Sequence, residues 1–348
     1  SAARDCQGGL RIMKPDARSP QIVAPINRPE DVKALYEAGA SELYCGILPE
    51  TWVEHFGTSD FLNKRQGTVA NLTSFADLEM LHAAAAKYQM PVALTLNTTY
   101  TQEMLPQVVQ VAETWAEMGG EAIMISDPTL FLLLQKRTPK VRRHLSILAN
   151  PFNHKVLQFF ARFGVTRAVL PRELSINEMQ QIIQKMPMME YEVMALNDKC
   201  RFIDGMCHFY HSTVFRSDQP TAMPYQTLNG RAEVKVCDPG YTGHGCSILF
   251  GSRANVKHDK TTLLPGNPGC AACMVGDLLT AGIGFFKLGG RGLPIQLNVR
   301  NVRFLKQVVD LTLCGNATTK RIRDLYQETF SQPCNPTVCY YAEWNRAS

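Results

Sequence analysis

Short apolar runs recur along the chain at a spacing that suits a sheet of parallel strands. Each run is rich in Val, Ile, Leu or Ala, and most runs are followed by apolar residues at helical spacing. This pattern predicts eight strands, at residues 22–24, 43–45, 92–96, 122–125, 145–148, 168–170, 191–195 and 284–288. Helices are expected in the intervals between most of them.

Capping residues mark where several of these helices begin and end. Ser175 and Glu178 have the spacing of a capping box, in which each side chain accepts a backbone N–H of the other residue. Asn150 followed by Pro151 predicts another helix start, because proline is favoured at the first helical position. Gly39 follows an apolar helical stripe and predicts the end of the first helix.

Strand and helix alternate about eight times, which favours an α/β fold, a TIM-like (β/α)8 barrel. An open doubly wound sheet has the same periodicity and stays an alternative. The expected barrel covers residues 21–313, between an N-terminal extension at 1–20 and a C-terminal helical tail at 314–348. A long cysteine-rich insertion, 196–282, follows the seventh strand, and another long connection covers 47–73. Both follow strand ends, the face on which barrel enzymes carry their chemistry.

Composition narrows the class of protein. The 348 residues are 45% hydrophobic and 19% charged, a balance that excludes disordered, collagen-like and coiled-coil chains. No apolar run reaches the ~18 residues of a membrane span, and the N-terminus lacks the apolar stretch of a signal peptide, so a cytoplasmic protein is expected. The net charge of +5 does not by itself indicate nucleic acid, and the basic run at 136–143 is expected to be a solvated turn.

Cysteine is the most informative residue type. A reducing cytoplasm keeps thiols free, so the eleven cysteines favour metal binding or catalysis over disulfide bonds. Six of them lie in the long insertion: Cys200, Cys207, Cys237, Cys246, Cys270 and Cys273. An iron–sulfur cluster, a four-cysteine zinc site and unligated thiols all stay open, although only Cys270 and Cys273 have the C-x2-C spacing of a zinc ribbon. Cys314, Cys334 and Cys339 are a weaker candidate for a second site, because their spacing is loose.

Polar residues after the predicted strands are candidates for ligand binding. Arg172 and Glu173 follow the sixth strand, and Lys287 and Arg291 lie at the end of the eighth, where barrel enzymes often hold anions. Ion pairs at the rim of the barrel are the alternative interpretation of both pairs. Asn97, at the end of the third strand, is a further ligand candidate.

Several stretches taken together resemble peptidase family U32, the collagenase-like peptidases. Residues 192–207, in which six residues separate Cys200 from Cys207, resemble the family signature. Residues 167–175 (RAVLPRELS) resemble the family's RVVLxRELS stretch, and residues 281–291 (AGIGFFKLGGR) resemble its AGVxxLKIEGR stretch. The likeness extends from about residue 20 to about residue 310.

The resemblance implies a [4Fe–4S] cluster on four cysteines and oxygen-independent hydroxylation, with prephenate as the oxygen donor. The expected function is therefore hydroxylation, or a related redox or oxygen transfer, of a small aromatic (quinone-like) or nucleobase substrate. Matched position by position, the resemblance assigns the cluster to Cys200, Cys207, Cys246 and Cys270, with Cys237 and Cys273 as alternates. Arg172, Lys287 and Arg291 would then position the anionic donor, and Arg65 and Asn71 are further site candidates.

Departures from the family pattern leave rival functions open. Leu196 and Asn197 stand where the family usually has His-Gly, and Gly289 replaces a Glu, so different substrate contacts are expected. About 60 residues follow the eighth strand, which favours a small molecule over RNA as the substrate. A dimer with a second copy or a similar subunit is compatible with the resemblance. The rivals are a true peptidase, although the sequence has neither an HExxH nor a GxSxG motif, and a non-catalytic iron–sulfur partner subunit.

Overall fold

Eight parallel strands close into a barrel in the computed structural model, which describes residues 19–56, 62–65, 68–197, 203–207, 210–211, 231–238, 245–252, 255–264, 269–335 and 339–341. The barrel strands are β1 (Gln21–Pro25), β2 (Glu42–Cys45), β3 (Val92–Leu96), β4 (Ala122–Ile125), β5 (Arg142–Leu145), β6 (Val165–Val169), β7 (Glu190–Leu196) and β12 (Phe285–Leu288). Their order around the barrel follows the chain, and β12 closes it by pairing with both β7 and β1. The predicted (β/α)8 barrel is confirmed, and the open sheet is excluded.

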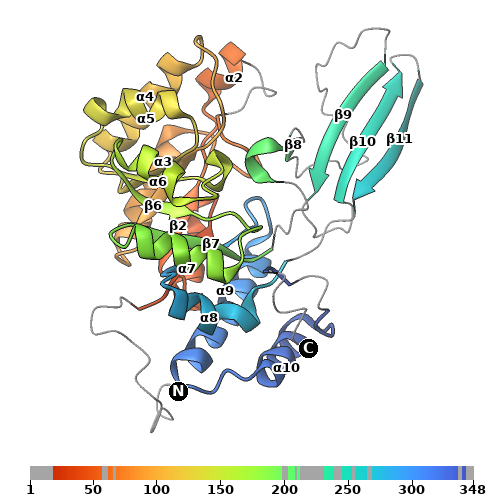
Figure 1. Cartoon of the computed structure of the whole chain (residues 1–348). Coiled ribbons are helices and arrows are strands. Elements are labelled where there is room, and N and C mark those ends of the chain that lie inside the picture. Colours follow the sequence, from red (N-terminus) through yellow and green to blue (C-terminus); the bar gives the residue numbers. More distant parts are fainter. Residues whose placement is uncertain are drawn as a thin grey trace.

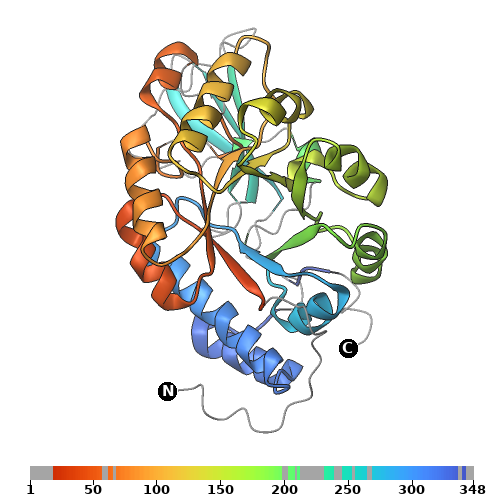
Figure 2. The same ribbon diagram turned by 90° about the vertical axis from the view of Figure 1, so that its left-hand side faces the viewer.

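Helices surround these strands, as Figure 2 shows. They are α1 (Val32–Ala38), α2 (Glu50–Phe56), α3 (Phe75–Ala86), α4 (Leu105–Glu117), α5 (Pro128–Arg137), α6 (His154–Ala161), α7 (Ile176–Lys185), α8 (Val275–Ala281), α9 (Ile295–Leu313) and α10 (Thr319–Phe330). The last helix packs on α9, where the rings of Tyr326 and Phe330 contact Phe304. None of the helices in the described part of the chain combines the length and the apolar composition that crossing a membrane requires.

The capping residues predicted the start of α7 correctly and the start of α6 incorrectly. Ser175 Oγ accepts the N–H of Glu178, and the Glu178 carboxylate accepts the N–H of Ser175, so the predicted capping box begins α7. Helix α6 instead has Asn153 as its N-cap, so the start predicted at Asn150 is wrong. Asn150 has a left-handed conformation, with φ 54°, and ends the short 3-10 helix η3 (Ile147–Ala149).

Strand β5 begins three residues earlier than the hydrophobic pattern predicts. Arg143, which the sequence placed in a solvated turn, is buried in this strand. Its guanidinium donates to the carbonyls of Leu134 and Thr138, at 2.8 and 3.2 Å, so the buried charge is hydrogen-bonded. The prediction missed the start of this strand because it followed only apolar runs, and Arg143 is charged.

The long insertion contains a sheet of its own. A four-stranded sheet in the order β11-β10-β9-β8 is formed by β8 (Tyr210–His211), β9 (Arg231–Asp238), β10 (Gly245–Ser252) and β11 (Asn255–Leu264) (Figure 1). β9 and β10 are antiparallel, and Cys237 stands directly opposite Cys246 in their register. Two of the candidate ligands therefore occupy neighbouring backbone positions.

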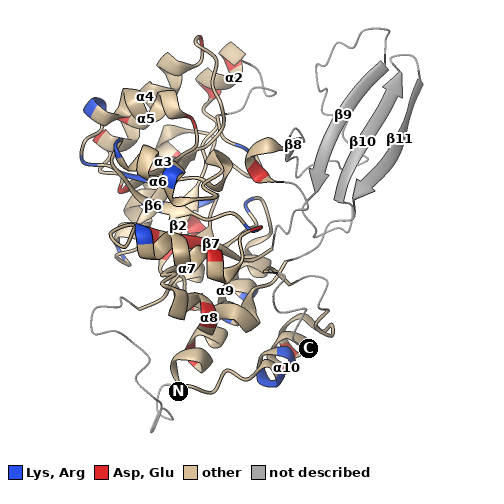
Figure 3. Cartoon of the chain, in the orientation of Figure 1, with Lys and Arg blue, Asp and Glu red and all other residues tan. Residues whose placement is uncertain are grey.

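Apolar side chains fill both sides of the barrel wall. The larger cluster lies between the strands and the helices and includes Leu43, Phe131 and Leu305. The smaller cluster consists of Val23, Tyr44, Ala93, Ala122 and Phe285. Charged residues lie not only on the surrounding helices but also on β7, as Figure 3 shows. The barrel interior is therefore not wholly apolar.

Candidate functional site

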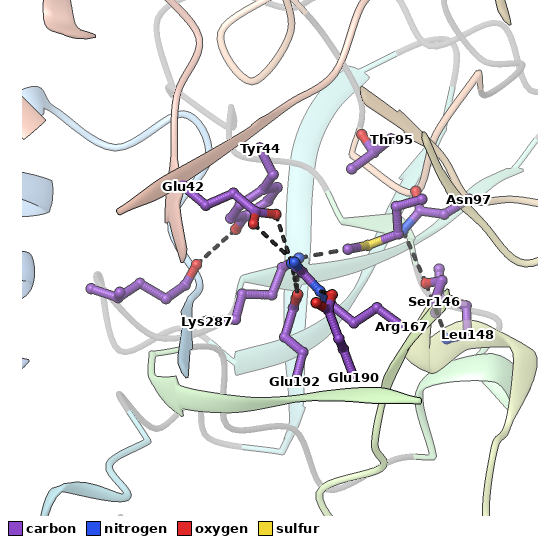
Figure 4. A network of polar contacts seen from close by, with 12 residues as sticks. Glu42, Tyr44, Thr95, Asn97, Ser146, Leu148, Arg167, Glu190, Glu192 and Lys287 are labelled. Atoms are coloured by element: carbon purple, nitrogen blue, oxygen red, sulfur yellow. Dashed lines mark hydrogen bonds and ion pairs between the residues drawn. The ribbon is translucent and has the colours of Figure 1, made fainter. Parts of the chain in front are cut away.

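Five charged side chains fill the barrel interior, as Figure 4 shows: Glu42, Arg167, Glu190, Glu192 and Lys287, here called the interior network. The Arg167 guanidinium holds the Glu42 carboxylate bidentately, at 2.7 and 3.0 Å. It also reaches Glu190 at 3.1 Å and Glu192 at 3.3 Å. Lys287 Nζ lies 2.9 Å from Glu192. These residues come from β2, β6, β7 and β12, and closure of the sheet brings them together.

Burial and ion pairing shift the pKa values of the interior network in opposite directions. Burial raises the pKa of Glu42, although Arg167 contacts its carboxylate. Burial also works against the charge of Glu192, but Lys287 and Arg167 outweigh it and lower the pKa of that carboxyl. Burial lowers the pKa of Lys287 in spite of the contact with Glu192. The charges therefore depend on one another, and removal of one partner would leave another charge buried without compensation.

Glu42, His144 and Glu192 are close enough to hold a metal ion, because their donor atoms lie within 4.8 Å of one another. Both carboxylates already contact Arg167 or Lys287, and these positive charges would repel the ion. Burial, together with the nearby cations, holds the pKa of His144 well below its usual value, so its ring is neutral. We interpret the interior network as a structural layer of the barrel.

A second polar layer lies at the carboxyl ends of the strands and consists mainly of neutral groups. Arg291 donates to Thr95 Oγ1 at 2.9 Å and to Asn63 Oδ1 at 2.8 Å. Asn63 Nδ2 in turn donates to Asn71 Oδ1 at 2.8 Å. A Cβ atom at Gly46 would collide with Arg291 and Asn71, so glycine is needed for this close approach. The predicted candidates Asn71 and Arg291 therefore belong to one hydrogen-bonded layer.

The same layer extends to the segment that carries Cys207. Asn97 Nδ2 donates to Ser146 Oγ at 3.3 Å, and Asn97 Oδ1 accepts the backbone N–H of Lys64 at 3.4 Å. Lys64 Nζ donates to the backbone carbonyl of Cys207 at 3.0 Å. We call this layer the mouth, and its members are Asn63, Lys64, Asn71, Thr95, Asn97, Ser146 and Arg291. The mouth therefore joins the barrel to the start of the insertion.

An ion pair holds the same segment from another side. Arg172, which follows β6, contacts both carboxylate oxygens of Asp204, with Nε 3.0 Å from Oδ2. Asp204 begins the short 3-10 helix η4 (Asp204–Met206), and Cys207 caps its end. Both side chains of the pair are almost buried, at 8% and 9% exposed, whereas Glu173 is exposed. Arg172 therefore positions the cysteine segment.

The model of peptidase family U32 matches residues 27–345. The chain belongs to peptidase family U32. The tRNA hydroxylation protein P of Escherichia coli is 26% identical over 192 residues, covering 54% of this chain and 38% of that protein. The 23S rRNA 5-hydroxycytidine C2501 synthase of Escherichia coli is 24% identical over 224 residues, which cover 63% of this chain and 30% of that protein. A collagenase of Porphyromonas gingivalis is 25% identical over 198 residues, which cover 54% of this chain and 44% of that protein. The chain spans less than half the length of each relative.

The cysteines of the U32 pattern are described to different extents. Cys200 lies outside the described residues, and for Cys237 and Cys246 the backbone alone is described. Cys207 is a partly buried thiol beside the mouth. Cys270 is buried next to the end of β7, where it forms an antiparallel bridge with Leu196. Of the predicted ligands and their alternates, the structure thus places the side chains of Cys207, Cys270 and Cys273.

The three residues predicted to bind an anion have different partners, although Lys287 and Arg291 both lie over the ring of Tyr44. Arg291 lies in the mouth, Arg172 is paired with Asp204, and Lys287 lies in the interior network. Sequence reasoning missed Asn63 and Asp204, which lie in connecting segments and match no motif. It also missed the interior network, for which the signal was present: charged residues at buried positions within otherwise apolar strands.

Proposed function

We propose that this U32 chain is a hydroxylase acting on a nucleobase, with a free aromatic ring as the second candidate substrate. Two relatives are named for tRNA hydroxylation and for the synthesis of 5-hydroxycytidine in 23S rRNA. In this chain the proposal is carried by the attachment of the Cys207 segment to the mouth, through Lys64 and through the Arg172–Asp204 pair. Barrel enzymes place their reacting groups at this end of the strands.

The proposed cofactor is a [4Fe–4S] cluster, which would supply electron transfer beside the mouth. The insertion is rich in thiols, and thiolates are the donors that such clusters prefer. Cys207 fits this role, because it is partly buried and its segment is held by two independent contacts. The family pattern adds Cys200, Cys246 and, as the fourth ligand, Cys270, with Cys237 and Cys273 as alternates.

The reaction needs an oxygen donor that also accepts electrons. Hydroxylation replaces a ring C–H bond by C–OH, which oxidises the ring by two electrons. Without O2, a donor such as prephenate gives up its hydroxyl oxygen, and the C–O bond that breaks in the donor is replaced by C–H, so the donor is reduced by the same two electrons. Prephenate carries carboxylates, and we assign their recognition to Arg291, which presents a guanidinium at the mouth.

Anaerobic purification of the full chain tests the cofactor. We expect a brown protein with broad absorbance near ~400 nm and at least about four irons per chain. A colourless protein that holds only zinc contradicts the cluster.

Mass spectrometry of nucleosides tests the reaction. RNA is incubated with the reduced protein and prephenate in the absence of O2, and a nucleoside that gains one oxygen atom supports the proposal. Cys207→Ser should be inactive, whereas Cys45→Ser, which changes a buried thiol of β2, should retain activity. If neither RNA nor free aromatic rings gain oxygen, the proposal fails.

A peptidase is the second candidate, because one relative is named a collagenase. Peptide hydrolysis requires an activated nucleophile or a metal ion with an open position. Among the described residues, one group of three metal-ligating side chains has its donor atoms within 4.8 Å of one another: Glu42, His144 and Glu192. The carboxylates of the two glutamates already contact Arg167 and Lys287. Turnover of casein or gelatin by the metal-free protein would favour the peptidase. Hydroxylation by the isolated chain would exclude a purely non-catalytic partner role.

A further inference from the structure

The C-terminal tail returns to the barrel beside Cys270. Cys339 forms a parallel bridge with Cys270, and the backbone N–H of Tyr340 donates to the carbonyl of Cys270 at 2.8 Å. Tyr340 and Tyr341 are buried, and their hydroxyls donate to backbone carbonyls at the end of β7. These contacts hold Cys339 next to Cys270, although the two cysteines are far apart in the sequence.

Cys270 and Cys273 form a turn that points a backbone donor at sulfur. Cys273 lies in the short 3-10 helix η5 (Ala272–Met274), and the N–H of Ala272 donates to Cys270 Sγ at 3.4 Å. Hydrogen bonds from the backbone favour a thiolate over a neutral thiol, because the acceptor then carries the charge. C-x2-C turns of this kind are frequent metal-binding elements.

Cys334 and Cys339 bring two more thiols to the same place. Cys339 pairs with Cys270 through the backbone bridge, and α10 packs against η5, which contains Cys273. Cys334 follows the last residue of α10 by four positions, so the chain brings it to the same end of the barrel. The tail cysteines are separated by four residues, so a C-x4-C pair meets a C-x2-C pair.

We propose that Cys270, Cys273, Cys334 and Cys339 form a second metal centre, in which four thiolates fasten the C-terminal tail to the end of β7. Zinc and iron–sulfur clusters are the soft centres that four thiolates prefer. The proposal does not depend on the hydroxylase activity. Cys314, grouped with the tail cysteines from the sequence, is disulfide-bonded and does not belong to the set.

The spacing of the sulfur atoms bears on the metal. Among the described residues, no three of these four sulfur atoms lie within 4.8 Å of one another. A single tetrahedral zinc with Zn–S bonds of ~2.3 Å would bring them to about 3.8 Å. The sulfur atoms would therefore have to move closer together to hold a single zinc ion.

A second centre changes the ligand assignment of the first. Cys270 and Cys273 then belong to the tail centre, and the proposed insertion cluster retains Cys200, Cys207, Cys237 and Cys246. Cys237 and Cys246 are directly opposite each other across β9 and β10. Each centre therefore has four cysteines of its own, and the two sets can be removed separately.

The metal content of three full-length variants tests the proposal. Cys334→Ser/Cys339→Ser removes the tail ligands, and Cys237→Ser/Cys246→Ser removes insertion ligands. Cys45→Ser removes a buried thiol of the barrel and is the matched control. Each protein is purified anaerobically, and iron and zinc per chain are measured by elemental analysis beside the absorption spectrum.

We expect the tail variant to lose the metal of one centre, about four irons for a cluster or one zinc, and to retain the other centre. Cys45→Ser should retain both centres. Protease should cut the chain after α10 at least tenfold faster in the tail variant than in the control. A folded tail variant that retains all of its metal overturns the proposal. If that variant does not fold, the insertion variant decides: metal retained by Cys237→Ser/Cys246→Ser supports the proposal, and loss of all metal from this variant overturns it.

The same variants separate this inference from the proposed function. Loss of hydroxylation in the insertion variant, with the tail metal retained, supports both. A tail centre in a protein that never hydroxylates any substrate leaves the second centre standing and removes the hydroxylase.

Discussion

The interior network and the mouth are both polar, but they are built from different chemistry. In the interior network, Arg167 and Lys287 each contact a carboxylate at 3.3 Å or less. In the mouth, Arg291 donates to a hydroxyl and an amide, and Asn97 and Ser146 extend the layer. Removal of one charge from the interior network would leave its partner buried without compensation. Hydrogen-bonding groups at the strand ends lie where barrel enzymes bind their ligands.

Replacement of Arg167 by Met should have the largest effect on stability. Glu42 would remain buried without its cation, and removal of one partner of a buried ion pair costs about 3–5 kcal/mol. We expect the free energy of unfolding in urea to fall by that amount. Arg137→Met, which breaks an exposed pair with Glu113, is the control and should cost about 0–1 kcal/mol. Equal losses in the two variants would contradict the structural role of the interior network.

Replacement of Arg291 by Gln should affect activity more than folding. A hydrogen bond from a charged donor contributes about 1.5–3 kcal/mol, so kcat/KM for the oxygen donor should fall about 10- to 100-fold. Arg303→Gln, at an exposed position of α9, should leave kcat/KM unchanged. Unaltered kinetics together with a loss of stability like that of Arg167→Met would place Arg291 in the structural layer instead.

His144 should make the stability of the barrel depend on pH. Its pKa is held well below 6.5 in the folded chain, so below about pH 6.5 the unfolded chain binds a proton that the folded chain does not. Stability therefore falls as the pH falls, by about 1 kcal/mol between pH 7 and pH 5.5. His144→Leu should remove this part of the slope in urea unfolding, and His55→Leu, at an exposed position, should not. A slope that is the same in all three proteins would exclude a buried neutral His144.

Replacement of Ser146 by Ala should have the smallest effect. The change removes the acceptor for Asn97 Nδ2 and for the N–H of Leu148, and a neutral hydrogen bond contributes about 1 kcal/mol. Urea unfolding should show a loss of that size. A loss as large as that of Arg167→Met would mean that the neutral mouth is as important for stability as the charged interior.

Local patterns accounted for most of the fold and for part of the site. Apolar runs located the barrel strands, and Ser175 with Glu178 located the start of α7. The prediction failed at β5, where buried Arg143 interrupts the apolar pattern, and it did not include the sheet of the insertion. In both places the strand is defined by backbone pairing with a neighbour, which a local pattern does not record.

The amino-acid sequence by itself determined the alternation of strands and helices, the family, and the cysteine-rich insertion, because these depend on neighbouring residues and on spacing. Only the tertiary structure decided which side chains meet. Glu42 and Arg167 are 125 positions apart, and closure of the barrel brings them into contact. Cys339 reaches Cys270 because buried tyrosines anchor the tail. Such contacts are set by the packing of distant segments, and no single stretch of the chain contains that information.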